Sequence, residues 1–218
     1  MLALDTGSPR VSLAVGRGGE VLAERSVEQE RSSGRLLALV VEALEEAGAT
    51  VRDLGAVVAL SGPGSFTGLR VGLATALGLH QALGVPAGAL PTLRALAASA
   101  PEWAGTVVGA VDALRGEWFV QAFRGGPAPT ALDEPRRLPA DELGGLGPCL
   151  LLGFGVEAAV AGPGRGGSGV SVRRPGPLAP VALRLAWLDP PRWDAGELTR
   201  PQYLRAPAVT IPRRAAAG

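Results

Sequence analysis

Short runs of alternating apolar and polar residues open the chain. They occupy residues 2–5, 11–15 and 20–27, and turn residues, among them Gly18 and Gly19, separate them. Alternation with a period of two residues is typical of strands that bury one face. The pattern therefore predicts an antiparallel meander at the start of the chain.

Helical stripes and buried apolar runs then alternate up to residue 100. Ser32 or Ser33 caps a predicted helix that runs to about Ala47, and Gly48 stands just past its end. The other predicted elements are strands at 54–60 and 85–90 and helices at 66–83 and 92–100. This order of strands and helices implies a mixed sheet with helices on its faces, an α/β fold.

The second half of the chain repeats the strand pattern with longer connections. Residues 106–123 predict two strands joined by a turn, 149–155 a third strand, and 180–188 a short helix. Gly and Pro are frequent between 125 and 180, which predicts irregular connections there. A boundary at the PEWAG segment (101–105) divides the chain into subdomains 1–103 and 104–218.

Composition excludes several classes of site. The 218 residues include no Lys, one His (His80) and one Cys (Cys149). A P-loop lysine, a lysine Schiff base, a two-histidine metal site and an internal disulfide are therefore all excluded. The formal net charge is +1, and the Arg-rich C-terminal quarter either contacts nucleic acid or an acidic partner, or is simply solvated.

The first residues predict a strand rather than a targeting segment. They lack the basic and apolar regions of a signal peptide, and no apolar run reaches the length of a membrane span. We therefore expect a cytoplasmic protein with no membrane contact.

The segment SGPGSFTGLRVG (61–72) carries the sharpest candidate chemistry. A Gly-Pro-Gly loop between a buried strand and a helix exposes backbone N–H groups at a positive helix terminus, which suits a phosphate. The alternative interpretation is a tight turn whose glycines allow close packing. The candidate phosphate loop consists of Asp5, Thr6, Gly62, Gly64 and Ser65.

The turn at Asp5 offers only half of an ATPase site. An actin-like ATPase would pair it with a glycine-rich, hydroxyl-bearing turn after Asp112, where this chain has Leu114 and Arg115. We therefore expect a structural role for Asp5. Asp112, Arg115 and Glu117 are open to two interpretations, a charged catalytic cluster or a salt-bridged hairpin turn.

Small residues recur every four positions along the predicted helix 66–83. Gly68, Gly72 and Ala76 form a bare face on which another backbone can approach closely, while Leu69 and Leu73 fill a neighbouring face. The bare face either packs within the chain or meets a partner chain.

Six segments together resemble the TsaB (YeaZ) family of bacterial tRNA threonylcarbamoyladenosine biosynthesis proteins. The most specific is GPGSFTGLRVG (62–72), and LALDTGS, LPTLRAL, VDALRGEWF, LLGFG and PQYLR support it. The resemblance covers nearly the whole chain. It implies two actin-like (ASKHA, ribonuclease H-like) subdomains, each a mixed sheet flanked by helices.

The resemblance also implies a function. Members of the family are non-catalytic partners of TsaD, which transfers a threonylcarbamoyl group to the adenosine beside the anticodon. The resemblance implies further contacts with the ATPase TsaE, with tRNA through the complex, and with a second copy of the chain when it is alone. No cofactor is expected to bind tightly, although ATP or ADP can lie at the interface with TsaD.

TsaD carries a pair of metal-binding histidines where this chain has Thr92, Leu93 and Arg94. With a single His, this chain is expected to hold no metal and to have no catalytic residues, and an interpretation as a metalloprotease fails for the same reason. The remaining alternative is an actin-like ATPase or phosphotransferase that uses Asp5 and the 61–65 loop.

By the same resemblance, the first two helices form the partner interface. Many relatives have a His-Ser or His-Thr where this chain has Ser32-Ser33. The predicted interface residues are Ser33, Leu36, Leu37, Val40, Val41, Leu44, Phe66, Gly68, Leu69, Gly72, Leu73 and Ala76.

Overall fold

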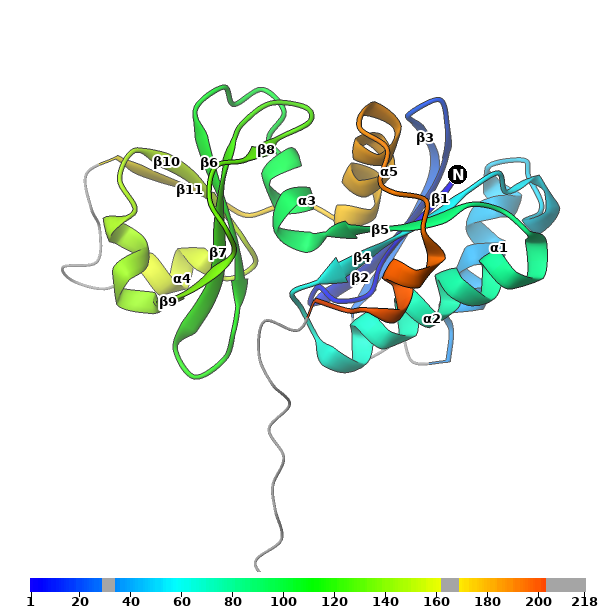
Figure 1. Ribbon diagram of the computed structural model, residues 1–218, viewed down its shortest axis with the longest axis horizontal. Coiled ribbons are helices and arrows are strands. Elements are labelled where there is room, and N and C mark those ends of the chain that lie inside the picture. The colour runs from blue at the N-terminus through cyan, green and yellow to red at the C-terminus, as the bar shows by residue number, and fades with distance from the viewer. Residues whose placement is uncertain (29–33, 162–168, 203–218) are drawn as a thin grey trace, which may run out of the picture.

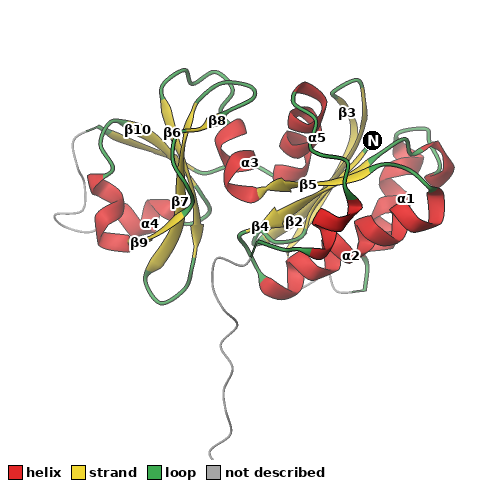
Figure 2. Ribbon diagram, viewed as in Figure 1, coloured by secondary structure: helices red, strands yellow, loops and turns green. Residues whose placement is uncertain are grey.

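Two β-sheets with helices between and outside them make up the molecule. A computed structural model describes residues 1–28, 34–161 and 169–202 of the 218-residue chain. The two sheets lie side by side along the long axis (Figure 1), and the helices flank both of them (Figure 2). The predicted fold class, α/β with a mixed sheet in each half, is confirmed.

The first sheet contains five strands. They are β1 (Leu2–Asp5), β2 (Arg10–Arg17), β3 (Glu20–Glu28), β4 (Val57–Gly62) and β5 (Ala87–Pro91). Their order in the sheet is β3-β2-β1-β4-β5. The first three strands pair antiparallel, as the alternating pattern predicts, whereas β4 runs parallel to both β1 and β5.

Helices cover both faces of this sheet. The face that carries Leu2 and Leu4 packs against α1 (Leu36–Glu46) and α2 (Phe66–Leu83) in one apolar cluster. The opposite face, which carries Ala3, packs against α3 (Thr92–Ala98) and α5 (Leu178–Leu188). All four residues of β1 are buried, as expected for a strand covered on both faces.

The start of α1 differs from the prediction. Arg35 occupies the N-cap position and makes no side-chain capping bond. The predicted caps, Ser32 and Ser33, lie outside the described residues. By contrast, α2 spans the predicted residues 66–83. The structure shows Ser65 as its N-cap and Gly84 as a left-handed C-cap at φ 69°.

The second sheet is larger than the sequence pattern predicts. Its strands are β6 (Thr106–Asp112), β7 (Glu117–Arg124), β8 (Thr130–Ala131), β9 (Arg136–Pro139), β10 (Cys149–Leu152) and β11 (Val170–Arg173). They lie in the order β11-β10-β6-β7-β8, and β9 also pairs with β7. Four of these strands lie in the Gly- and Pro-rich region 125–180, where the sequence predicts only the strand that became β10; β8, β9, β11, the helix α4 (Val156–Val160) and the 3-10 helix η3 (Ala140–Gly145) stand where irregular connections are predicted. That prediction is wrong for these segments.

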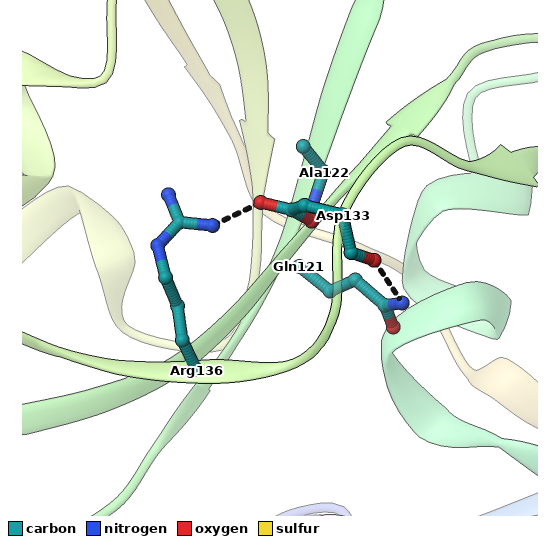
Figure 3. A network of polar contacts seen from close by, with 4 residues as sticks. All are labelled: Gln121, Ala122, Asp133 and Arg136. Carbon is teal, nitrogen blue, oxygen red and sulfur yellow. Dashed lines mark hydrogen bonds and ion pairs between the residues drawn. The ribbon is translucent and has the colours of Figure 1, made fainter.

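Asp133 holds the connection between β8 and β9 against β7 (Figure 3). Its Oδ1 accepts a hydrogen bond from the Ala122 N–H at 2.7 Å, and its backbone carbonyl accepts one from Gln121 Nε2 at 2.9 Å. Its carboxylate also forms an ion pair with Arg136. One residue thus anchors a segment in which the paired strands are short.

The two sheets share a core through α3 and α5. Gly109 of β6 lies so close to α3 that an added Cβ would be 2.4 Å from the Leu93 carbonyl oxygen. Helix α5 belongs to the predicted second subdomain, yet its Ala179 N–H donates to Ser12 Oγ of β2 at 3.1 Å. The 3-10 helix η4 (Ala195–Thr199) also packs against α2 and β5. The assignment of 104–218 to a second subdomain therefore needs correction, because residues 178–199 return to the first sheet.

None of the helices in the described part of the chain is both long enough and apolar enough to cross a membrane.

Candidate functional site

The turn after β1 buries a carboxylate. Asp5 is fully buried, and its Oδ1 accepts hydrogen bonds from the N–H groups of Gly7 (3.1 Å) and Ser8 (3.2 Å). Its Oδ2 has no hydrogen-bond partner within the described residues. Burial raises the pKa of Asp5 to about 6, against the lowering effect of the hydrogen bonds from Ser8 and Gly7.

The Gly-Pro-Gly loop packs directly on this turn. The Ser65 N–H donates to the Gly7 carbonyl at 2.8 Å, and an added Cβ on Gly64 would lie 2.7 Å from the same oxygen. Only glycine therefore fits at position 64 without displacing the backbone of the turn. The Ser65 hydroxyl accepts the Gly68 N–H at 3.3 Å and so caps α2.

Helix α2 and the segment at Gln202 also pack against the β1 turn and the Gly-Pro-Gly loop. An added Cβ on Gly72 would lie 2.1 Å from Thr6 Oγ1, so α2 crosses the end of β1 with no room for a side chain. On the other side, the Gln202 N–H donates to the Ser61 carbonyl at 2.8 Å. Gly62 has φ +114°, and an added Cβ there would lie 2.9 Å from the Gln202 carbonyl oxygen.

The structure therefore brings together Asp5, Thr6, Gly62, Gly64 and Ser65, the predicted phosphate loop. Four N–H groups that would face an anion there, those of Gly7, Ser8, Ser65 and Gly68, already have acceptors inside the chain. A phosphate in this loop would have to displace these internal bonds. A bound nucleotide thus stays a prediction, and the glycines are explained by close packing.

Helices α1 and α2 also present apolar side chains to solvent. Leu37 is 59% exposed and Val41, one turn along α1, is 43% exposed; Phe66 and Val71 on α2 are 40% and 44% exposed. We call these four residues the α1–α2 surface. The Arg70 guanidinium lies 3.9 Å from the centre of the Phe66 ring, a cation–π contact that leaves the ring partly uncovered.

Most of the residues predicted for the partner interface lie inside the chain instead. Gly72 packs against Thr6 in the turn after β1, and Gly68 and Ala76 are buried, which decides between the two interpretations of the small-residue face in favour of internal packing. The buried members, which this structure leaves unavailable to a partner, are Leu36, Val40, Leu44, Gly68, Leu69, Gly72, Leu73 and Ala76. Ser33 lies outside the described residues, and Leu37, Val41 and Phe66 are at the surface.

Val71 was missed by the sequence prediction. The helical periodicity of α2 could have identified it. Val71 lies away from the face of Gly68, Gly72 and Ala76, and an apolar residue there is exposed when that face is buried.

The turn between β6 and β7 forms a hairpin. The Leu114 N–H donates to Asp112 Oδ1 at 2.7 Å, and Arg115 has no carboxylate within ion-pair distance in the described residues. Glu117 pairs with Arg137 of β9 at 3.4 Å. These contacts support a hairpin turn rather than a catalytic cluster. The salt bridge lies between Glu117 and Arg137 of β9, and not within the turn as predicted.

The single His and the single Cys both have structural surroundings. Nδ1 of His80 lies 2.8 Å from the Val85 carbonyl oxygen, and Cys149 is buried in the core of the second sheet, where burial raises the pKa of its thiol. Among residues 1–28, 34–161 and 169–202, no group of three or more His, Cys, Asp or Glu side chains is placed to hold a metal ion.

Comparisons with known proteins give a consistent picture. Residues 20–130 match the sequence model of the family described as TsaD, tRNA N6-adenosine threonylcarbamoyltransferase. An uncharacterized protein of Mycobacterium tuberculosis is 44% identical over 89 residues, which are 39% of this chain and 42% of that protein. The tRNA threonylcarbamoyladenosine biosynthesis protein TsaB of Escherichia coli is 34% identical over 121 residues, 55% of this chain and 52% of that protein. The match thus spans about half the length of these curated relatives.

A solved structure extends the similarity to nearly the whole chain. It is that of an uncharacterized Pseudomonas aeruginosa protein with similarity to the peptidase YeaZ. It superposes with a TM-score of 0.75 at 26% identity, covering 94% of this chain and 98% of that one.

Proposed function

The chain belongs to the family of the threonylcarbamoyltransferase TsaD, as a member of its TsaB/YeaZ group, and on this premise we propose that it is a non-catalytic subunit in the synthesis of threonylcarbamoyladenosine in tRNA. In this proposal it binds TsaD and holds it in its active conformation. The name of the curated TsaB relatives, tRNA threonylcarbamoyladenosine biosynthesis protein, supports the pathway.

The α1–α2 surface carries the proposed contact with TsaD. Leu37, Val41, Phe66 and Val71 are large apolar side chains on two helices that share one core cluster on the same face of the first sheet. Large apolar side chains exposed on one face of a protein are candidates for an interface, where an aromatic ring often contributes strongly to the binding energy. Their helices are fixed by the buried residues beneath them, so the surface is ready to bind without rearrangement.

Two observations support a non-catalytic role. The sequence contains one His, which cannot supply the histidine pair that the resemblance assigns to TsaD. In the loop that resembles TsaD, the Ser65 N–H donates to the Gly7 carbonyl and the Ser65 hydroxyl accepts the Gly68 N–H, which favours a packing role. We therefore propose that the Gly-Pro-Gly loop of this chain positions α2 rather than a substrate.

Further partners belong to the same proposal. TsaE joins the complex, tRNA is contacted through it, and ATP or ADP binds at the shared interface without being hydrolysed by this chain. When TsaD is absent, the α1–α2 surface pairs two copies of the chain. We also propose a cytoplasmic location, where tRNA is modified.

The affinity of the chain for TsaD tests the role of the α1–α2 surface. We expect Leu37→Arg combined with Val41→Arg to weaken binding of the cognate TsaD at least about ten-fold, because two charges would be buried against an apolar partner. Both positions are exposed, so the fold should tolerate the change. Affinity is measured by surface plasmon resonance with immobilised TsaD.

Leu132→Arg is the matched control, since Leu132 is 50% exposed but lies on the second sheet's side of the molecule. It should bind TsaD like the wild type. Equal binding by the α1 double variant would remove this surface from the proposal. Tight binding and turnover of Mg-ATP by the isolated chain, measured by calorimetry, would instead favour the ATPase alternative.

A further inference from the structure

A pocket of about 330 Å³ opens at the end of the first sheet opposite the Gly-Pro-Gly loop. Met1 and Val15 line it, so it lies where β1 begins, whereas the loop packs on the turn where β1 ends. In Figure 1 this end is marked by N, beside α5 and the β2–β3 hairpin. The volume falls within the range of small-molecule sites.

The floor and rim of the pocket are apolar. Val15, Leu44 and Leu183 form a buried floor contributed by β2, α1 and α5. At the rim, Leu22 and Trp187 are 43% and 55% exposed. Water therefore contacts an indole and an isobutyl group beside an apolar hollow, and an apolar ligand that covered them would remove this surface from water.

The Trp187 indole is held in place by the hairpin. An added Cβ on Gly19 would lie 2.6 Å from Trp187 Cδ1, so the ring rests on the bare backbone of the turn between β2 and β3. Gly19 has φ +81°, a conformation that favours glycine. A ring fixed in this way presents a binding face whose ordering costs little when a ligand arrives.

The charges at the pocket favour an anion. Arg17 lines the wall, and within the described residues it has no carboxylate at ion-pair distance. The acid in the lining, Asp53, interacts with the charge of Arg17 at longer range than an ion pair, and its Oδ2 accepts hydrogen bonds from both the N–H and the hydroxyl of Thr50 at 2.8 and 2.7 Å. The guanidinium therefore keeps its donors available for a carboxylate or similar group.

We propose that this pocket binds a small organic anion with an apolar body. Its acidic group contacts Arg17, and its aromatic or aliphatic body covers Leu22 and Trp187. The pocket includes none of the four residues of the α1–α2 surface, although Leu44 of α1 lines it. It does not depend on the proposed role with TsaD, so the two proposals can fail separately.

Calorimetry on the isolated full chain tests the site with 4-phenylbutyrate as the probe and its uncharged amide, 4-phenylbutyramide, as the chemical control. The acid should bind at least about ten-fold more tightly than the amide. Arg17→Gln should remove that difference, and Trp187→Ala should weaken both compounds about ten-fold. Both side chains are at the surface, so circular dichroism should show folded variants.

Two matched variants complete the experiment. Trp193→Ala removes an indole that is 40% exposed outside the pocket lining, and Arg124→Gln removes an exposed charge on β7; both should bind the acid like the wild type. The proposal is overturned by no binding of the acid up to about 10 mM, by equal binding of acid and amide, or by binding that Arg17→Gln and Trp187→Ala leave unchanged.

Discussion

Asp5 makes the stability of this protein depend on pH in an unusual direction. Its folded pKa of about 6 lies above its ordinary value of 3.8 because burial disfavours the carboxylate. The folded state thus holds the proton more tightly than the unfolded state between these two values. The ionised group lowers the free energy of unfolding above pH 6 by about 3 kcal/mol, and this loss disappears as the pH falls toward 4.

We therefore expect Asp5→Asn to change the pH dependence of the unfolding free energy. Relative to the variant, the wild type should gain about 3 kcal/mol between pH 7 and pH 4, measured by urea denaturation. Asp53→Asn should act in the opposite direction, since hydrogen bonds from Thr50 hold the pKa of Asp53 below its ordinary value and its contribution is lost as the pH falls. Parallel pH curves for the wild type and Asp5→Asn would contradict this role for Asp5.

Gly72 is required by close approach rather than by backbone angles. A methyl group there would meet Thr6 Oγ1, so Gly72→Ala should lower the free energy of unfolding by about 1–3 kcal/mol. Gly78 is the control on the same helix. An added Cβ there has no neighbour within 4 Å, so Gly78→Ala should raise stability by about 0.5–1 kcal/mol. Both changes are measured by urea denaturation, and equal effects at the two positions would refute the contact with Thr6.

The packing of Gly72 could not be predicted from the sequence. A small-residue stripe indicates that a backbone comes close, but it does not say which one. The resemblance predicts Gly72 at a partner interface, whereas Thr6, 66 residues earlier in the turn after β1, lies at that position. Burial of Leu69 and Leu73 follows from the same packing, and no local pattern distinguishes it from burial under a partner.

At the scale of elements, the β6–β7 hairpin carries backbone strain. Leu114 and Arg115 have φ values of +64° and +58°, a backbone conformation that is disfavoured for residues other than Gly and Asn. Replacing Arg115 with Gly should therefore raise the free energy of unfolding by about 1 kcal/mol, measured by thermal and urea denaturation. An Arg115→Ala variant, which keeps the Cβ, should bring no such gain. A gain from Ala equal to that from Gly would assign the effect to lost charge instead of strain.

The sequence predicts well those elements whose ends and apolar periodicity are both visible in the local sequence. The bounds of α2, 66–83, follow from a Ser cap, a helical stripe and a terminal Gly. The two-residue β8 and the Pro-containing β9 have no such pattern, and they exist because β7 offers them a pairing edge and Asp133 anchors the connection between them. Pairing between strands that are distant in the sequence cannot be predicted from a short window of residues.

At the scale of the whole molecule, the chain crosses between its two halves more than once. Helix α5 follows the second sheet in sequence but packs against the first, and its contacts with α3 join the two sheets through one core. The boundary predicted at residue 103 assigns α5 to the second half, because the apolar stripe of α5 could pack against either sheet. The sequence therefore did not predict that α5 packs against the first sheet. The α1–α2 surface lies on the opposite face of the first sheet from this shared core, which leaves it accessible to a partner.

We propose that this chain acts by docking onto TsaD and is required for the modification of tRNA. Its most direct test is the yield of threonylcarbamoyladenosine in tRNA, in a reconstitution with the cognate TsaD, TsaE, ATP and a source of threonylcarbamoyl-adenylate. We predict that omission of the chain lowers the yield at least about ten-fold, that Leu37→Arg with Val41→Arg fails to restore it, and that Leu132→Arg restores it fully. Full yield without the chain, or full restoration by the α1 double variant, would contradict the claim.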